Sequence, residues 1–138
     1  MLIGHGWDLH QHSDSKNLIL GGVNFAEDGF EGHSDGDILL HALCDALLGA
    51  TGKKDLGHYF PSNESTPKDI PSTDIFSEIL NVVEYEKFSL TNVDITIITQ
   101  KFNVQDKAVK IQNNLSKLLK VPVAVSYTHL TLPTKRIV

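Results

Sequence analysis

The sequence predicts an α+β fold, in which helices are layered on one face of a small mixed β-sheet. Apolar residues recur at helical spacing in three segments, which begin near residues 37, 71 and 104. Segments rich in β-branched residues precede, separate and follow these helices, and 90–99 alternates most clearly. The resulting order is strand, strand, helix, helix, strand, helix, strand, which is typical of an α+β domain.

The chain has 138 residues, of which 41% are hydrophobic and 21% charged, as in ordinary globular domains. We predict one domain over 1–125, followed by an atypical tail over 126–138. The net charge is −5 and no basic cluster precedes the C-terminus, so we expect no nucleic-acid partner. Apolar runs are short and broken by charge, so we expect no membrane partner.

The expected location is a reducing cytoplasm. Cys44 is the single cysteine, which excludes an internal disulfide. The first residues lack the basic start and long apolar stretch of a signal peptide. We expect Cys44 to be a small core residue rather than a ligand.

Two strands are predicted before the first helix. Segment 2–9 mixes apolar residues with Gly4 and Gly6, where another backbone or a ligand can approach closely. Segment 18–23 is predicted as a strand with a bend at its glycines, paired with the first strand.

The first helix is predicted from about Asp37 to Gly49–52, with Ser34 or Asp35 as its N-cap. Its predicted apolar face consists of Leu39, Leu40, Leu43, Leu47 and Leu48.

The rest of the chain is predicted as a long loop, two helices and two strands. The loop covers 53–71, and a length of this kind in a small domain is more often functional or mobile than idle. A helix begins at 71–74, the clearest strand is 90–99, and a third helix covers 104–118. Segment 121–125 is predicted to enter a last strand.

Asp8 and His10 are two residues apart, so in an extended strand their side chains share a face. Carboxylate and imidazole are normal ligands of divalent transition metals. Alone, such a pair is more often a hydrogen-bonded structural pair, and His12 extends the pattern. With His41 as a third ligand, one coordination position stays open, as in catalytic rather than structural zinc sites.

Asp37, His41 and Asp45 are spaced four residues apart and form one polar stripe on the predicted helix. Such a stripe is either a solvated face or a site, in which the start of the helix can bind an anion. Asp45 either orients a metal-bound histidine or is solvated.

Six motifs occur together: GHGWDLH (4–10), LGGV (20–23), GHSDGD (32–37), HALCDALLGA (41–50), DLGHYFP (55–61) and NVDITII (92–98). In this order and spacing, from residue 1 to about 123, the sequence resembles the 2-C-methyl-D-erythritol 2,4-cyclodiphosphate synthase family of the non-mevalonate isoprenoid pathway. The resemblance implies a homotrimer with each active site between two subunits.

The resemblance implies that Asp8, His10 and His41 hold Zn²⁺, and that Mg²⁺ or Mn²⁺ binds the substrate diphosphate. It implies that His33 is catalytic and that His33 and Ser34 contact the substrate phosphates. The other implied substrate-binding residues are Asp8, His10, Asp55, Leu56, Gly57, Phe60, Pro61, Ser62, Asn63 and Glu64. The implied nucleotide-binding residues are Thr99, Gln100, Lys101, Phe102, Asn103, Val104 and Gln105.

The implied substrate is a small cytidine diphosphate compound, 4-diphosphocytidyl-2-C-methyl-D-erythritol 2-phosphate. Its 2-phosphate attacks the β-phosphorus, CMP leaves and a cyclic diphosphate forms. Two other functions stay open: a metal-dependent phosphoesterase that acts on a diphosphate, and an inactive zinc-binding remnant.

The sequence departs from the family in three places. Phe102-Asn103 replaces the usual Pro-Lys pair of the nucleotide loop, and His12 replaces an apolar or aromatic residue. After residue 123 the family's Thr-Thr-Glu motif, with its magnesium-binding glutamate, is not found. We therefore expect 126–138 to be foreign or frame-shifted, the last strand to be missing or altered, and a neighbouring strand edge to be unpaired.

Overall fold

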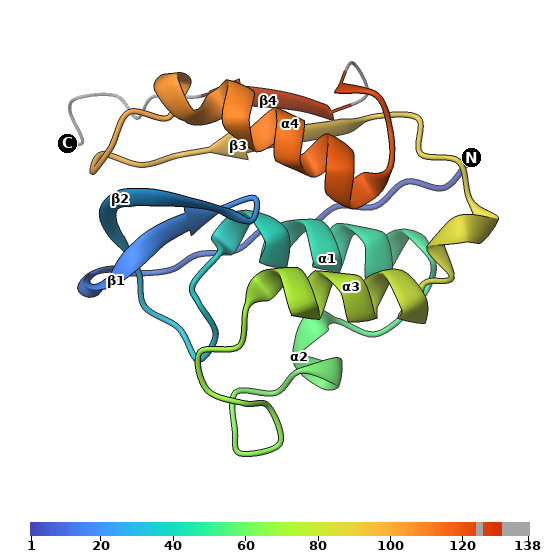
Figure 1. Ribbon diagram of the computed structural model, residues 1–138. Coiled ribbons are helices and arrows are strands. Elements are labelled where there is room, and N and C mark those ends of the chain that lie inside the picture. Colours follow the sequence, from blue (N-terminus) through green and yellow to red (C-terminus); the bar gives the residue numbers. More distant parts are fainter. Residues whose placement is uncertain (124–125, 131–138) are drawn as a thin grey trace, which may run out of the picture. The chain divides into compact units, whose positions relative to one another are not determined.

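The computed structural model describes residues 1–123 and the backbone of 126–130. These residues form two compact units, of which the first is Met1–Phe88 and the second begins at Ser89. The first unit contains β1 (His12–Leu20), β2 (Val23–Phe30), α1 (Ile38–Ala50), α2 (Leu56–Tyr59), α3 (Ser72–Val82) and η1 (Tyr85–Lys87) (Figure 1). The second contains β3 (Val93–Ile97), η2 (Gln105–Lys107), α4 (Ala108–Leu119) and β4 (Ser126–Leu130).

The strands β1 and β2 form an antiparallel hairpin in which Leu20 pairs with Val23. The two residues between them, Gly21 and Gly22, have φ values of 60° and 80°, as a two-residue hairpin turn requires. The predicted strand 18–23 is therefore the end of β1 plus a chain reversal. Its predicted pairing with 2–9 is wrong, because the turn directs β1 onto β2.

Residues 1–10 lie outside any strand, so the predicted strand 2–9 is also wrong. This N-terminal segment instead runs along α1 (Figure 1). A Cβ atom at Gly4 would collide with the carbonyl oxygen of Ala46, and one at Gly6 with that of Ala42. The prediction that another backbone approaches at these two glycines is confirmed.

Helix α1 begins after Asp37, whose buried carboxylate is its N-cap. Asp37 Oδ1 accepts hydrogen bonds from Leu40 N at 3.0 Å and Gly21 N at 3.1 Å, and Oδ2 accepts one from Gly22 N at 2.7 Å. Burial raises the pKa of Asp37 to about 6, although these three donors oppose the shift. This one side chain therefore joins the hairpin turn to the start of α1.

The predicted N-caps Ser34 and Asp35 are wrong. Gly36 has a φ of 80°, which breaks the helical path between these residues and α1. A helix can begin only after this left-handed residue, where Asp37 is the first side chain in position.

The core of the first unit lies between α1 and α3, which pack side by side (Figure 1). Cys44 is fully buried in α1, which confirms its predicted place in the core, and burial raises the pKa of its thiol. The buried apolar residues of the two helices are Leu39, Leu40, Leu43, Cys44, Leu48, Ile75, Phe76 and Ile79.

The second unit contains a parallel pair of strands, β3 and β4, with Val93 opposite Ser126 and Ile97 opposite Leu130. Helix α4 lies between them in the chain and provides the crossover that parallel pairing needs. The expectation was a last strand that is missing or altered. That it is missing is wrong, and that it is altered stays a prediction. Backbone ladder bonds do not depend on the family's usual side chains, so Ser126–Leu130 can pair without the Thr-Thr-Glu motif.

The α+β prediction is confirmed at the level of a small mixed α/β protein with a small antiparallel sheet and helices. The described residues form two separate two-stranded sheets instead of one mixed sheet. That 1–125 is one domain stays a prediction, and the predicted tail beyond 130 lies outside the described residues. No helix in the described part of the chain combines the length and the apolar character that crossing a membrane would need.

Replacing Asp37 with alanine should lower the free energy of unfolding by about 3 kcal/mol, because three backbone N–H groups lose their acceptor at about 1 kcal/mol each. Asp37→Asn keeps one side-chain oxygen as an acceptor, so it should lower the free energy of unfolding by about half as much as Asp37→Ala. Urea denaturation measures both values. Glu78→Ala, at an exposed position of α3, is the control and should change stability by less than about 0.5 kcal/mol. An equally small effect of Asp37→Ala would contradict the assigned role.

Candidate active site

Asp8 and His10 on the N-terminal segment meet His41 on α1, and their ligand atoms lie within 4.8 Å of one another. Asp8 Oδ2 lies 3.1 Å from His10 Nδ1 and 3.3 Å from His41 Nδ1. All three residues are half-buried. The predicted triad is thus brought together, although the strand used to predict it is absent. The close passage of Gly6 over α1 brings the two chain segments within reach.

The atoms of this triad fit a bound cation. Asp8 Oδ2 and His10 Nδ1 are buried and lack a hydrogen-bond partner of good geometry among the described residues. Such atoms cost free energy unless something else pairs with them. Burial raises the pKa of Asp8, but the His10 and His41 rings outweigh it and hold this pKa well below its usual range. An ionised carboxylate beside two imidazoles is a donor set for a divalent metal ion.

Two serine hydroxyls contact the His41 ring at Nε2, the nitrogen that does not face Asp8. Its Nε2 lies 3.1 Å from Ser34 Oγ and 3.0 Å from Ser72 Oγ. Asp45, which is predicted either to orient a metal-bound histidine or to be solvated, accepts a hydrogen bond from Leu56 N at 2.8 Å. Ser72 was not predicted, since no local pattern links it to a residue 31 positions earlier.

His33 and Ser34 lie in the loop between β2 and α1, before the helix rather than in its first turn. His33 Nε2 lies 2.6 Å from the carbonyl oxygen of Thr66, so this nitrogen donates and the ring is held against the next loop. Ser34 is buried and its hydroxyl faces His41. That His33 and Ser34 contact the substrate phosphates stays a prediction, and both residues precede Asp37, which occupies the start of α1.

His12 lies on β1 opposite Phe30 of β2, and the two ring centroids are 4.5 Å apart. Its ring belongs to this packing, and the three-residue cluster consists of Asp8, His10 and His41 without it.

The predicted substrate-binding loop contains the short helix α2, which the sequence did not predict. Asp55 caps this helix through a hydrogen bond of 3.1 Å from His58 N. Asn63 forms a turn, in which its side chain accepts a hydrogen bond from Ser65 N at 2.9 Å. The predicted residues Ser62, Asn63 and Glu64 are exposed.

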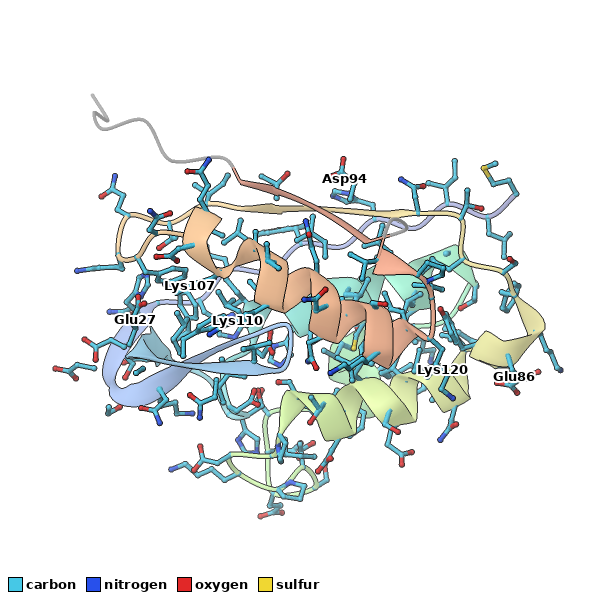
Figure 2. All side chains as sticks on the ribbon, turned by 45° about the horizontal axis from the view of Figure 1, so that its top comes forward. Glu27, Glu86, Asp94, Lys107, Lys110 and Lys120 are labelled. Atoms are coloured by element: carbon cyan, nitrogen blue, oxygen red, sulfur yellow. The ribbon has the colours of Figure 1, made fainter. Side chains whose placement is uncertain are left out.

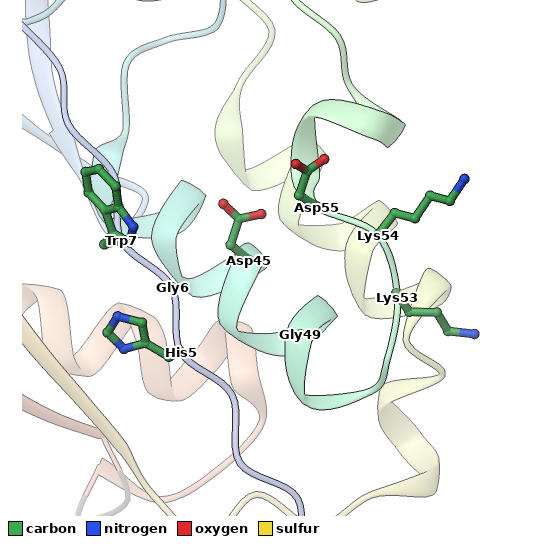
Figure 3. Close-up of a pocket in the computed structure, with 8 residues that line it drawn as sticks. All are labelled: His5, Gly6, Trp7, Asp45, Gly49, Lys53, Lys54 and Asp55. Carbon is green, nitrogen blue, oxygen red and sulfur yellow. The ribbon is translucent and has the colours of Figure 1, made fainter.

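An open pocket of the first unit lies between the N-terminal segment and α1 (Figure 3). Figure 3 shows Trp7 and His5 on one wall, and Asp45 and Asp55 opposite them. Of the predicted substrate-binding residues, Asp55 is the one that lines it. The full lining is His5, Gly6, Trp7, Asp45, Gly49, Lys53, Lys54 and Asp55.

The predicted nucleotide-binding segment, 99–105, lies in the second unit after β3. Asn103 Oδ1 accepts a hydrogen bond from Gln105 N at 2.9 Å, and Lys107 Nζ donates to Asn103 O at 3.2 Å. Lys107 is buried and supports the backbone of this loop. The basic residues that follow are spread along α4, with Lys110 in its first turn and Lys120 at its C-cap (Figure 2).

The fold and the triad define a small α/β protein with a carboxylate–imidazole centre suited to a divalent metal. A model of the YgbB family matches residues 1–131. A protein named 2-C-methyl-D-erythritol 2,4-cyclodiphosphate synthase, from Francisella tularensis subsp. novicida, is 40% identical over 124 residues, which are 88% of this chain and 78% of the relative. The chain therefore belongs to the YgbB family of cyclodiphosphate synthases, and it is an enzyme of the lyase class.

Solved structures agree with this membership. One described as the bifunctional IspDF from Campylobacter jejuni has a TM-score of 0.89 and 30% identity, with 99% of this chain and 37% of that longer chain covered. Another, described as 2C-methyl-D-erythritol-2,4-cyclodiphosphate synthase bound to CDP, has a TM-score of 0.86 and 27% identity. This match covers 96% of this chain and 89% of the other chain. The family match also extends past the end of the resemblance predicted at about 123, and it includes β4.

Removing one triad side chain should abolish tight binding of Zn²⁺, used here as the probe ion. His41→Ala and His10→Ala should each weaken binding by about 100-fold or more, because losing even an outer partner of a ligand costs about 10- to 100-fold. Competition with a chromophoric chelator measures this affinity. His58→Ala, on the exposed face of α2, is the matched control, and His12→Ala should also leave the affinity unchanged. Unchanged affinity in His41→Ala would exclude the triad as the metal site.

Proposed function

We propose that this protein converts 4-diphosphocytidyl-2-C-methyl-D-erythritol 2-phosphate to 2-C-methyl-D-erythritol 2,4-cyclodiphosphate and releases CMP. The observation that carries the proposal is the convergence of Asp8, His10 and His41 in a chain 40% identical to a named synthase. A structural relative described as bound to CDP supports a cytidine nucleotide as the substrate class.

In this reaction the 2-phosphate oxygen attacks the β-phosphorus, and the bond from that phosphorus to the oxygen of CMP breaks. The two reacting groups belong to one molecule, and both are negatively charged. The barrier therefore consists largely of repulsion and orientation, which a site lowers by positioning and by fixed positive charge. No protein nucleophile is required, in agreement with the burial of the Cys44 thiol.

We assign Asp8, His10 and His41 to Zn²⁺ and the substrate diphosphate to Mg²⁺ or Mn²⁺. Bound metal ions supply positive charge that offsets the charge of the phosphates. Ser34 and Ser72 hold the His41 ring through its Nε2. His33 donates from Nε2 to Thr66, so its Nδ1 is the ring atom left to hold or move a proton at a phosphate oxygen.

The remaining assignments concern substrate contacts and assembly. We assign the methylerythritol part to the loop that contains Asp55 and Gly57, and the cytidine to 99–105. We also propose a homotrimer with its active sites between subunits. The exposed apolar side chains Ile3, Trp7 and Leu9 support an interface, because large apolar groups gathered at a surface are typical of association sites.

Incubation with the diphosphocytidyl substrate, Zn²⁺ and Mg²⁺ should yield the cyclic diphosphate and CMP, identified by phosphorus NMR. His41→Ala should form neither product at a measurable rate, and Glu78→Ala, at an exposed position of α3, should match the parent. A linear phosphate product would instead establish a metal-dependent phosphoesterase. Zinc retention without CMP release would establish an inactive zinc-binding remnant.

Asn103→Lys should lower KM for this substrate. Asn103 is exposed in the predicted nucleotide loop, where the family usually has lysine. An added ammonium beside the diphosphate should contribute about 1 kcal/mol, or about a fivefold lower KM. Steady-state kinetics measure the change. Asn113→Lys adds the same charge at an exposed position of α4 and is the control. Equal KM values for the parent and Asn103→Lys would contradict this assignment.

A further inference from the structure

We propose that Ser72 and Asp35 are positioning residues that keep a hydrogen on Nε2 of His41 and thereby leave its Nδ1 lone pair to face Asp8. The importance of this arrangement for catalysis rests on the proposed function, in which the triad holds a metal ion. The arrangement of hydrogens itself depends only on contacts within the first unit.

The network begins at Asp35, in the loop before α1. Its Oδ2 accepts a hydrogen bond from Ser72 N at 2.9 Å, and its Oδ1 accepts from the Ser72 hydroxyl and from Asp37 N, the last at 3.1 Å. An ionised carboxylate only accepts hydrogen bonds. The hydroxyl hydrogen of Ser72 is therefore committed to Asp35.

The direction of the next hydrogen bond follows from this commitment. Ser72 Oγ lies 3.0 Å from His41 Nε2. Because its only hydrogen points to Asp35, Ser72 Oγ must accept, and His41 Nε2 must donate. Ser72 is fully buried, so little water competes for this contact.

The consequence appears at the opposite side of the His41 ring. A neutral imidazole carries one hydrogen, and here Nε2 holds it, so Nδ1 presents a lone pair. This lone pair lies 3.3 Å from Asp8 Oδ2, another acceptor. Two acceptors at this distance repel one another unless a proton or a metal ion lies between them. The network therefore prepares the triad for a cation, because no hydrogen on Nδ1 has to be displaced when the ion binds.

Ser72 also begins α3, and Asp35 satisfies its backbone N–H, so a purely structural role must be distinguished. A helix cap alone would change stability and would leave the hydrogen on His41 where it is. The position of that hydrogen is therefore the decisive measurement, and it can be made without metal or substrate.

Long-range proton–nitrogen NMR of histidine-labelled, metal-free protein reports which ring nitrogen of His41 bears hydrogen. We expect hydrogen on Nε2 in the parent and in Ser72→Thr, which keeps the hydroxyl. In Ser72→Ala the acceptor that fixes the direction is lost, and the Ser34 hydroxyl, 3.1 Å from Nε2, can donate to this nitrogen instead. The hydrogen should then move to Nδ1, where Asp8 can accept it. Ser77→Ala, at an exposed position of α3, is the matched control and should resemble the parent.

Zinc affinity, measured by chelator competition, should fall by about 10- to 100-fold in Ser72→Ala and in Asp35→Asn, whose amide can donate to Ser72 and reverse the network. Ser72→Thr and Ser77→Ala should bind as the parent does. An unprotonated Nε2 in the metal-free parent would overturn the proposal whatever the protein catalyses. Parent-like affinity and hydrogen position in folded Ser72→Ala would also overturn it. Failure of substrate turnover alone would contradict the proposed function. It would not affect the hydrogen position on His41 or the zinc affinity, which test this proposal.

Discussion

The N-terminal segment passes so close to α1 that two of its residues have no room for a side chain. Gly4 and Gly6 face the carbonyl oxygens of Ala46 and Ala42, and a Cβ at either position would push the segment off the helix. Two residues beyond this contact, Asp8 turns toward His41 and forms the centre of the triad. The geometry of the triad thus depends on backbone packing that precedes it in the chain.

The motif at 32–37 supports this centre through two carboxylates with separate tasks. Asp37 joins the hairpin turn to the start of α1, while Asp35 holds the first residue of α3. Lys16 adds a third connection, because its Nζ donates to the carbonyl oxygens of Gly32 and Ser34 at 2.7 Å. His41 is therefore oriented by a loop that is itself tied to β1, α1 and α3.

Local patterns predicted the helices well, because each buries one face at a spacing of 3.6 residues. Thus α1, α3 and α4 lie where apolar periodicity placed them, whereas the strand predicted over 2–9 is absent. Apolar residues between glycines suit either a strand or an extended segment packed on a helix, and only the neighbouring α1 backbone decides between them. Similarly, β4 pairs with β3 through backbone hydrogen bonds. The residues of Ser126–Leu130 lack the family's motif, so the sequence did not indicate this strand.

By itself, the sequence determined the residue types of the site. A carboxylate and two imidazoles suited to a divalent metal could be identified from Asp8, His10 and His41, and the family from the ordered motifs around them. Only the tertiary structure decided which atoms face one another. Nδ1 of His41 faces Asp8 and Nε2 faces Ser72, a residue from a different helix. The orientation of the His41 ring depends on packing between segments that are distant in the sequence. Such contacts produce no periodic pattern of residues from which they could be predicted.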